Sequence, residues 1–388
     1  MTIGVTGAFG FLGASCVAEL LANPLATEQH LVAFGSSRFN SPLFDRSAVE
    51  VRPLNILDTS SLDVAIAGID MLIHFAGKVG FAARDKRSVW DANVLGALHV
   101  FRAAQKAGVR MIINIASVSA LGPAPELLTQ ESPIPCLAKP SADCQPNYHF
   151  WHHNGRWYRP LTEQDRPYDD SGSPWSFKNQ DEALAAVRMS LAGDYSFLNR
   201  VSCIYLDSKL TNLELVHQLY RDEGLPVVNI LPGTAIGRGE AHTGIVDLIR
   251  ALASGRLKSV LPGACSFMDS RDFAGGVKKA LLLGKPGEDY ILAGAPENNL
   301  SFSQLANLVL ERCESRKSAH SGKILELPCF PARIAGYLAE RILPSLALSE
   351  GTVLSGCVKA PCSSEKAIRE LGYAPFSLIR CAIAEILK

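Results

Sequence analysis

The sequence has no excess of charge of either sign. Its 388 residues include 38 Lys or Arg and 38 Asp or Glu, which gives a formal net charge of zero, and the basic residues form no long run. Proteins that bind nucleic acid by electrostatic attraction usually carry basic clusters. We therefore expect no nucleic-acid partner.

Long uninterrupted hydrophobic runs are also missing. The most apolar late segment, FPARIAGYLAERILPSLAL at 330–348, contains Arg333, Glu340 and Arg341 and is divided by Pro344. A spanning helix needs about 20 predominantly apolar residues, so we expect no transmembrane segment, whereas peripheral membrane contact stays open. The first residues already read as an apolar strand, which leaves no space for a secretory signal. These features predict a cytoplasmic protein.

Metal-binding motifs are absent as well. The ten cysteines form no CxxC pair and no zinc-like spacing. Several lie in apolar stretches such as 14–21, so we expect buried thiols in a reducing compartment rather than disulfides. His149, His152 and His153 have no carboxylate or cysteine ligand at a recognisable spacing. We expect a loop surface or a substrate contact there, and no metal site.

The first third of the chain does contain a regular alternation of apolar runs and helical patterns. Hydrophobic residues make up 47% of the chain, enough for a substantial core. The alternation predicts an α/β fold with a doubly wound parallel sheet. Predicted strands are 3–5, 30–34, 49–54, 70–75, 110–115 and 226–231, and predicted helices are 10–22, 59–67 and 88–107. Ser60, followed by Asp63, is close to a capping box at the start of the second helix.

The regular alternation stops after Gly122. Residues 123–200 are rich in proline, aromatic and polar residues, and they are longer than an ordinary crossover. Asn154-Gly155 lies between aromatic flanks and predicts a type I′ hairpin, so we interpret this segment as an insertion. Further on, the patterns predict helices at 244–254, 303–312, 331–342 and 363–371 and a strand at 289–293. We expect a main domain over 1–233 and a smaller C-terminal region over 234–388, with about 260–283 returning to the main domain.

A glycine-rich turn follows the first strand. The stretch VTGAFGFLG places Gly7, Gly10 and Gly13 between that strand and a helix. Gly7 allows a tight turn, Gly10 allows close approach to a pyrophosphate, and Gly13 lets the helix pack on the strand. The free N–H groups and the dipole of the helix N-terminus then favour an anion. The spacing and context favour a dinucleotide site.

The residues after the second strand indicate which dinucleotide binds. An NAD site usually offers an acidic residue there, whereas an NADP site replaces it and supplies a cation for the phosphate. Here Gly35-Ser36-Ser37-Arg38 contains no acid. This favours NADP, with Arg38 as phosphate partner and Ser36 as a hydrogen-bond donor. NAD stays open, because Arg38 can also be a solvated loop charge.

Six motifs in order resemble the extended short-chain dehydrogenase/reductase superfamily. They are TGAFGFLG (6–13), HFAG (74–77), NVLGALHVFRAA (93–104), NIASVSALG (114–122), YLDSK (205–209) and LPGTAIGRG (231–239). Three later motifs are similar to its dihydroflavonol-reductase and 3β-hydroxysteroid-dehydrogenase-like branch: FMDSRDFAGGV (267–277), GEDYILAG (287–294) and SSEKAIRELGYAP (363–375). The resemblance implies a Rossmann domain with a C-terminal substrate domain, a nicotinamide cofactor and a Ser-Tyr-Lys site.

The resemblance also implies which residues form the site. The serine is expected at Ser117, with Ser119 as the alternative. Dehydratase relatives carry an acid just after this position, whereas Val118 follows Ser117, which lowers the dehydratase interpretation. Two further departures are Asn55 in place of an acid on the adenine side and Leu231 in place of an arginine before Pro232. The expected cofactor-binding residues are Thr6, Gly7, Phe9, Gly10, Phe11, Leu12, Gly13, Ser36, Arg38, Asn55, Ile56, Phe75, Ala76, Gly77, Asn93, Tyr205, Lys209 and Pro232.

Two lysines compete for the catalytic position. Tyr205 and Lys209 are four residues apart, so on a helix both can face one cleft. Lys178, in SPWSFK, has Pro174 at the equivalent spacing and no phenol. Tyr205 would protonate the developing alkoxide, while Lys209 would lower the pKa of that phenol and hold the nicotinamide ribose. We therefore predict Tyr205 and Lys209.

The leading functional hypothesis is an NADP(H)-dependent oxidoreductase that acts on a ketone or aldehyde of a moderately apolar metabolite, or on its alcohol. One alternative is a nucleotide-sugar epimerase with tightly bound NAD. Another is a non-catalytic dinucleotide sensor or scaffold. The resemblance also implies that a homodimer can form through helices that flank the sheet.

Overall fold

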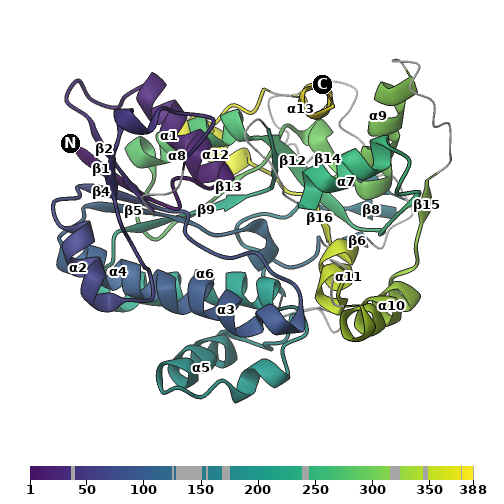
Figure 1. The fold of residues 1–388 in the computed structure, drawn as a ribbon, viewed down its shortest axis with the longest axis horizontal. Coiled ribbons are helices and arrows are strands. Elements are labelled where there is room, and N and C mark those ends of the chain that lie inside the picture. Colours follow the sequence, from purple (N-terminus) through teal and green to yellow (C-terminus); the bar gives the residue numbers. More distant parts are fainter. Residues whose placement is uncertain are drawn as a thin grey trace.

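The computed structural model describes residues 1–35, 40–124, 126–127, 151–153, 156–167, 175–237, 244–314, 324–343, 348–376 and 378–387. A parallel sheet of seven strands lies at its centre, in the order β3-β2-β1-β4-β5-β9-β13 (Figure 1). The strands are β1 (Thr2–Thr6), β2 (His30–Phe34), β3 (Glu50–Arg52), β4 (Met71–His74), β5 (Met111–Ile115), β9 (Val227–Pro232) and β13 (Asp289–Leu292). The predicted α/β class with a doubly wound parallel sheet is confirmed.

Helices cover both faces of this sheet. One face carries α2 (Thr59–Ile66), α3 (Lys86–Trp90), α4 (Ala97–Lys106), α5 (Gln180–Leu191) and α6 (Ile204–Glu223), and the other carries α1 (Phe11–Ala22), α8 (Ser270–Leu283) and α12 (Glu365–Leu371) (Figure 1). Because both faces are covered, the central strands are apolar almost throughout; Ile3, Val5, Ile112 and Ile113 are fully buried.

The register brings the carboxyl ends of the central strands together. Thr6 of β1 pairs with Phe34 of β2 and with His74 of β4, and His74 pairs with Asn114 of β5. In open α/β sheets, ligands bind outside these carboxyl ends, where the strand order reverses. The predicted glycine turn, Ser117 and the start of α6 all follow or approach this edge.

Most predicted elements are confirmed, and two local predictions are wrong. The helix over 59–66 begins after Asp58, whose side chain accepts a hydrogen bond from the Ser60 nitrogen at 3.2 Å. Asp58 is therefore the cap rather than Ser60, and Asp63 pairs with Lys106. The predicted helix over 88–107 is interrupted by a π-helical segment, Asp91–Gly96, between α3 and α4.

The C-terminal region contains a smaller sheet. Strands β10 (Thr234–Ile236), β12 (Ala264–Asp269), β14 (Asn299–Ser301) and β16 (Lys359–Ala360) form it, and β11 (Ser259–Val260) pairs with β15 (Leu325–Glu326). Around them lie α7 (Gly244–Ala253), α9 (Phe302–Glu314), α10 (Cys329–Ile342), α11 (Glu350–Cys357) and α13 (Ile379–Ile386). The chain returns to the main fold where α8 packs on α1 and β13 joins the large sheet. The domain boundaries themselves stay a prediction.

The cysteines differ from expectation at one pair, which forms a disulfide, and at Cys381, which is an exposed thiol. Cys16, Cys203, Cys313 and Cys362 are buried thiols, as predicted. However, Cys329 and Cys357 form a disulfide that connects α10 and α11. This disulfide could not be predicted from the sequence, because the two cysteines are separated by 28 residues and have no recognisable spacing.

The inserted segment contains the predicted hairpin. β7 (Trp151–His153) and β8 (Arg156–Tyr158) are antiparallel, and β6 (Glu126–Leu127) pairs with β8. The turn residues 154 and 155 lie outside the described residues. The segment also contributes α5, which the sequence patterns did not predict and which packs on α6.

Candidate active site

The glycine turn has the backbone geometry of a phosphate-binding loop. Gly7 has φ of 65°, a conformation that favours glycine. A Cβ on Gly13 would lie 2.2 Å from the Gly7 carbonyl oxygen, so only glycine fits there. Gly10 is exposed at the N-terminus of α1 and has no side-chain cap. The first N–H groups of α1 therefore stay free to bind an anion.

A cavity of about 550 Å³ opens beside this turn. It lies between the ends of β1, β2 and β4, and it collects many of the predicted cofactor residues. Its lining comprises Gly7, Phe9, Gly10, Phe34, Gly35, Asn40, Leu54, Asn55, Ile56, Ala76, Gly77 and Ala92. The glycine turn and this cavity together fit a dinucleotide.

Thr6 connects the glycine turn to β4. Its hydroxyl oxygen accepts a hydrogen bond from the Ala76 nitrogen at 3.2 Å and lies 2.9 Å from Nδ1 of His74. His74 is buried, and burial together with the nearby charge of Lys209 lowers its pKa to about 3. The imidazole is therefore neutral at physiological pH.

Asn93 fixes the loop after β4 against α6. Its amide oxygen accepts from the Lys78 nitrogen at 2.7 Å, and its amide nitrogen donates to the Lys78 carbonyl at 2.9 Å and to the Ser208 hydroxyl at 3.0 Å. Asn93 belongs to the π-helical segment, which turns its side chain toward Gly77 and α6. The buried Asn93 amide thus connects the loop after β4 to α6.

Ser117 and Tyr205 meet at the start of α6. Ser117 follows β5, is buried, and its hydroxyl oxygen accepts from the Ser119 nitrogen at 3.1 Å. Burial raises the pKa of the Tyr205 phenol, and a side-chain hydrogen bond with Ser117 opposes that rise. The phenol is therefore protonated at neutral pH and lies beside the predicted serine.

Lys209 lies one helical turn beyond Tyr205. Its ammonium group donates to the carbonyl of Ile115 at 3.3 Å, at the end of β5. Burial lowers the pKa of Lys209 from 10.5 to about 8, because low polarity disfavours the charged form. The structure thus brings Ser117, Tyr205 and Lys209 to one edge of the sheet.

The surroundings of Tyr205 are largely apolar. Its ring lies 5.3 Å from the ring of Phe81, and both pack against a small cluster that includes Leu354 and Val358. Trp175 belongs to the same cluster, and its indole nitrogen donates to the Ser119 carbonyl at 3.1 Å. The inserted segment and the C-terminal region both contribute to this side of the site.

Asp207 is a residue that sequence reasoning missed. It is fully buried on α6, and it accepts hydrogen bonds from the nitrogen and the hydroxyl of Ser176 at 2.7 and 2.8 Å. Its acidic side chain between Tyr205 and Lys209 was the available signal. Lys178 in SPWSFK is exposed. The residues of this motif that contact the site are Trp175 and Ser176.

The remaining predicted site residues lie around the glycine turn, at the end of β9, in the cavity lining or outside the described residues. Ser36 and Arg38 lie outside the described residues, so the predicted phosphate partner stays a prediction. Phe11, Leu12 and Phe75 are half-buried around the glycine turn, and Pro232 ends β9. Asn55 lines the cavity, where its side chain accepts from the Leu57 nitrogen at 3.1 Å. His149 also lies outside the described residues.

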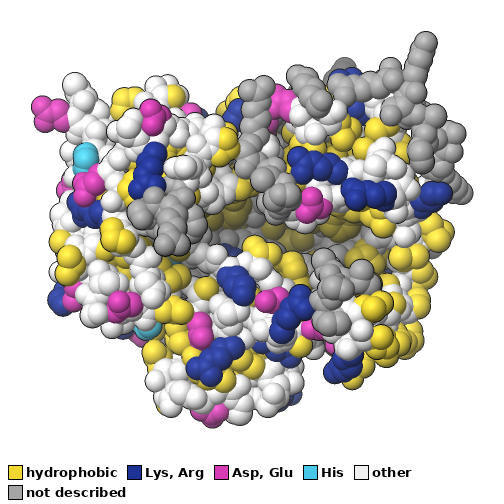
Figure 2. All heavy atoms as spheres, viewed as in Figure 1, with side chains coloured by type: hydrophobic (Ala, Val, Ile, Leu, Met, Phe, Trp, Pro, Cys, Tyr) yellow, Lys and Arg dark blue, Asp and Glu magenta, His cyan; other side chains and the backbone are white. Residues whose placement is uncertain are grey.

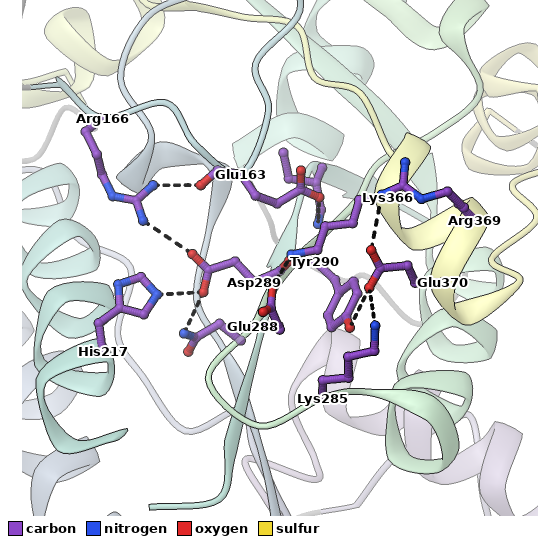
Figure 3. Close-up of polar contacts among 12 residues, drawn as sticks. Glu163, Arg166, His217, Lys285, Glu288, Asp289, Tyr290, Lys366, Arg369 and Glu370 are labelled. Carbon is purple, nitrogen blue, oxygen red and sulfur yellow. Dashed lines mark hydrogen bonds and ion pairs between the residues drawn. The ribbon is translucent and has the colours of Figure 1, made fainter. Parts of the chain in front are cut away.

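A second polar cluster lies away from the site, between α6, β13 and the inserted segment (Figure 3). Asp289 accepts hydrogen bonds from His217 at 2.8 Å and from Asn229 at 2.9 Å, and Arg166 lies 3.4 Å away. Burial raises the pKa of Asp289, but these partners outweigh it and the net shift is downward. Arg166 also faces the buried Glu214 at 3.5 Å. This cluster anchors the inserted segment to the sheet.

Comparisons with known proteins agree with this architecture. Residues 3–145 match the NAD dependent epimerase/dehydratase family. The chain is 25% identical to sterol demethylase protein B of Methylococcus capsulatus over 295 residues, which cover 76% of this chain and 70% of that protein. It is 30% identical to a putative dihydroflavonol 4-reductase of Synechocystis over 118 residues, about a third of each chain (30% and 33%).

A similar solved structure is that of a double mutant of a dTDP-glucose 4,6-dehydratase from Streptomyces venezuelae, determined with NAD bound. The identity is 17%, the TM-score is 0.63, and the match covers 100% of this chain and 96% of that one. At this identity the likeness shows the fold. The family match, the curated relatives and the shared fold all support the predicted resemblance to the extended short-chain dehydrogenase/reductase superfamily.

Proposed function

We propose that this protein is an NADP(H)-dependent oxidoreductase. It reduces the ketone or aldehyde of a moderately apolar metabolite, or oxidises the corresponding alcohol. The observation that carries the proposal is the grouping of Ser117, Tyr205 and Lys209 at one edge of the sheet, with Ser117 beside the Tyr205 phenol and Lys209 one turn away on the same helix. Retention of all three groups also argues against a purely non-catalytic sensor or scaffold.

The cofactor preference rests on the sequence after β2. The cavity beside the glycine turn supports binding of a dinucleotide, and Gly7, Gly10 and the N-terminus of α1 would hold its pyrophosphate. No acidic residue stands at 35–38, and Arg38 supplies a cation. We therefore propose NADP over NAD, although the solved relative from Streptomyces holds NAD.

The chemistry divides between the cofactor and the chain. The bound nicotinamide supplies or accepts a hydride. In the reducing direction, Tyr205 gives its phenolic proton to the carbonyl oxygen, and Ser117 donates a hydrogen bond that orients this oxygen. Lys209 stabilises the phenolate that remains until a proton from solvent restores it. In the oxidising direction the same proton leaves the alcohol and passes to Tyr205.

Apolar residues beside Tyr205 support an apolar substrate. The Phe81 ring lies 5.3 Å from the Tyr205 ring, and Leu354 and Val358 pack against the same buried apolar cluster as Tyr205. Apolar surroundings of this kind suit a fused-ring or isoprenoid carbonyl compound better than a nucleotide sugar, which would need several polar partners. The match to a sterol demethylase protein is consistent with this substrate class.

Cofactor titration followed by a carbonyl screen tests the proposal. We expect tighter binding of NADPH than of NADH, and turnover of an apolar ketone with consumption of NADPH. Tyr205→Phe should lower kcat about a hundredfold or more and leave the Kd for NADPH nearly unchanged. Unchanged turnover would refute the assignment of Tyr205, whereas retained stoichiometric NAD with no net NADPH consumption would favour the epimerase.

A further inference from the structure

Helix α10 presents a broad apolar stripe to solvent. Phe330, Ile334, Tyr337, Leu338 and Ile342 are between 43% and 76% exposed. Their spacing of three and four residues places them on one side of the helix. Single exposed apolar residues are normal, but a continuous stripe marks an interaction surface. Figure 2 shows hydrophobic side chains gathered at the lower right, where α10 lies in Figure 1.

The opposite side of α10 is firmly packed on α11. A Cβ on Gly336 would lie 2.7 Å from the Ser349 carbonyl oxygen, so the helix approaches α11 closely. The Cys329 and Cys357 disulfide joins the start of α10 to the end of α11. The packing and the disulfide together hold α10 in place on α11. The exposed stripe is therefore the outer face of a packed helix.

The two-helix unit also reaches the candidate active site. Leu354 on α11 and the following Val358 pack in the cluster that contains Tyr205. Cys203, at the start of α6, lies with its sulfur 3.6 Å from the Gly351 carbonyl oxygen. One side of the unit thus faces the site, and its outer side carries the apolar stripe.

We propose that α10 docks on the surface of a lipid bilayer and lies in its interfacial plane. Its 14 residues rise about 1.5 Å each, so the face of the helix covers roughly 200 Å² at a width of about 10 Å. A stable protein interface needs roughly 800 Å² per partner. An interfacial helix needs only its own apolar face, which is what α10 offers.

The two arginines of α10 suit the same environment, while Glu340 accepts a hydrogen bond from the Ala83 nitrogen. Arg333 is half exposed and pairs with Glu350 at 2.7 Å. Arg341 lies with its guanidinium carbon 3.5 Å from the ring centre of Tyr337. Long cationic side chains of this kind cover apolar surface while their charged ends reach the lipid headgroups. Among the described residues, no helix is long and apolar enough to cross a membrane, so binding would be peripheral.

Vesicle flotation of the full chain tests this inference without any turnover. Membrane docking rests on the proposed function only in explaining why an apolar substrate would be taken up from a membrane. Flotation measures docking alone, so docking and the proposed activity can each be refuted without the other. We expect the native chain to float with phosphatidylcholine vesicles that also contain phosphatidylglycerol. Ile334→Ser combined with Leu338→Ser should lower the vesicle partition coefficient at least about tenfold.

A matched control is available on α8. Leu282 and Leu283 are similarly exposed, at 60% and 54%, and replacing both with Ser should leave flotation unchanged. Thermal unfolding of both double variants checks that each is folded. Equal loss of flotation in both variants, or no flotation of the native chain, would overturn the proposal. A native dimer that only the α10 variant dissociates would instead identify the stripe as a protein interface.

Discussion

Asp207 holds Ser176 through two hydrogen bonds, one from the backbone nitrogen at 2.7 Å and one from the hydroxyl at 2.8 Å. Asp207 lies on α6 between Tyr205 and Lys209, and Ser176 follows Trp175 in the segment that enters the main fold from the insertion. The Ser176 hydroxyl also accepts from the Ser202 nitrogen at 3.0 Å. One buried carboxylate therefore fixes this segment to the helix that carries Tyr205.

Loss of this carboxylate should affect substrate binding more than cofactor binding. Asp207→Ala leaves two donors of Ser176 without their acceptor, and we expect the free energy of unfolding to fall by roughly 2 to 4 kcal/mol. Because Trp175 would lose its fixed position, KM for an apolar ketone should rise, while the Kd for NADPH stays near that of the native chain. Asp207→Asn keeps an acceptor oxygen and should restore most of the KM. Equal KM values for the Ala and Asn variants would contradict a positioning role.

The same residue predicts a specific pH dependence of stability. Burial raises the pKa of Asp207 from 3.8 to about 7. Between these values the folded chain binds more protons at this site than the unfolded chain, so the contribution of Asp207 to stability falls as pH rises. Asp207→Asn cannot titrate. The stability of the Asn variant relative to the native chain should therefore increase from about pH 4 to about pH 7, by up to about 1.4 kcal/mol per unit, as measured by denaturant unfolding. A difference that is constant across this range would contradict the assignment.

Local patterns in the sequence were sufficient for the parts of the site that depend on short spacings. Gly7 and Gly13 follow a strand and open a helix, and Tyr205 and Lys209 are one helical turn apart, so both arrangements are encoded within a few residues. The contact between Asp207 and Ser176 could not be predicted in this way. It joins the inserted segment to α6, and only the packing of α5 and α6 brings the two residues together.

Sheet order and the short helix α11 were beyond the same reasoning. The order of parallel strands depends on which crossover helices share a face, and hydrophobic periodicity carries no information about this. Helix α11 was missed because Gly351 and Gly356 interrupt its short pattern. The disulfide between Cys329 and Cys357 was missed for a related reason, since only the packing of α10 on α11 brings the sulfurs together.

The glycine turn offers a test of cofactor binding that is independent of catalysis. In Gly13→Ala, the new methyl group would meet the Gly7 carbonyl oxygen at 2.2 Å, so the turn must open. We expect the Kd for NADPH to rise about tenfold or more, a cost of about 1.4 kcal/mol or more. Gly275→Ala on α8 is the matched control, because its methyl group meets nothing within 4 Å. That variant should bind NADPH normally and gain up to about 1 kcal/mol of stability. Normal NADPH binding by the Gly13 variant would argue against this turn as the pyrophosphate site.

The buried ammonium of Lys209 should give activity and stability opposite dependences on pH. Its pKa is lowered by burial from 10.5 to about 8, so the charge that stabilises the Tyr205 phenolate is lost as pH rises through about 8. The pKa of Tyr205 is raised, so the phenol stays protonated there and the fall in kcat/KM for ketone reduction reports Lys209.

Stability should change in the other direction over the same range. Between pH 8 and 10.5 the unfolded chain binds more protons at Lys209 than the folded chain does, so the contribution of this residue to the free energy of unfolding rises with pH. Lys209→Met should remove both effects, which a kcat/KM profile and denaturant unfolding at matched pH values measure. Lys178→Met, at the exposed lysine of SPWSFK, should preserve both. If activity and stability of the native chain declined together above pH 8, unfolding rather than deprotonation of Lys209 would explain the loss.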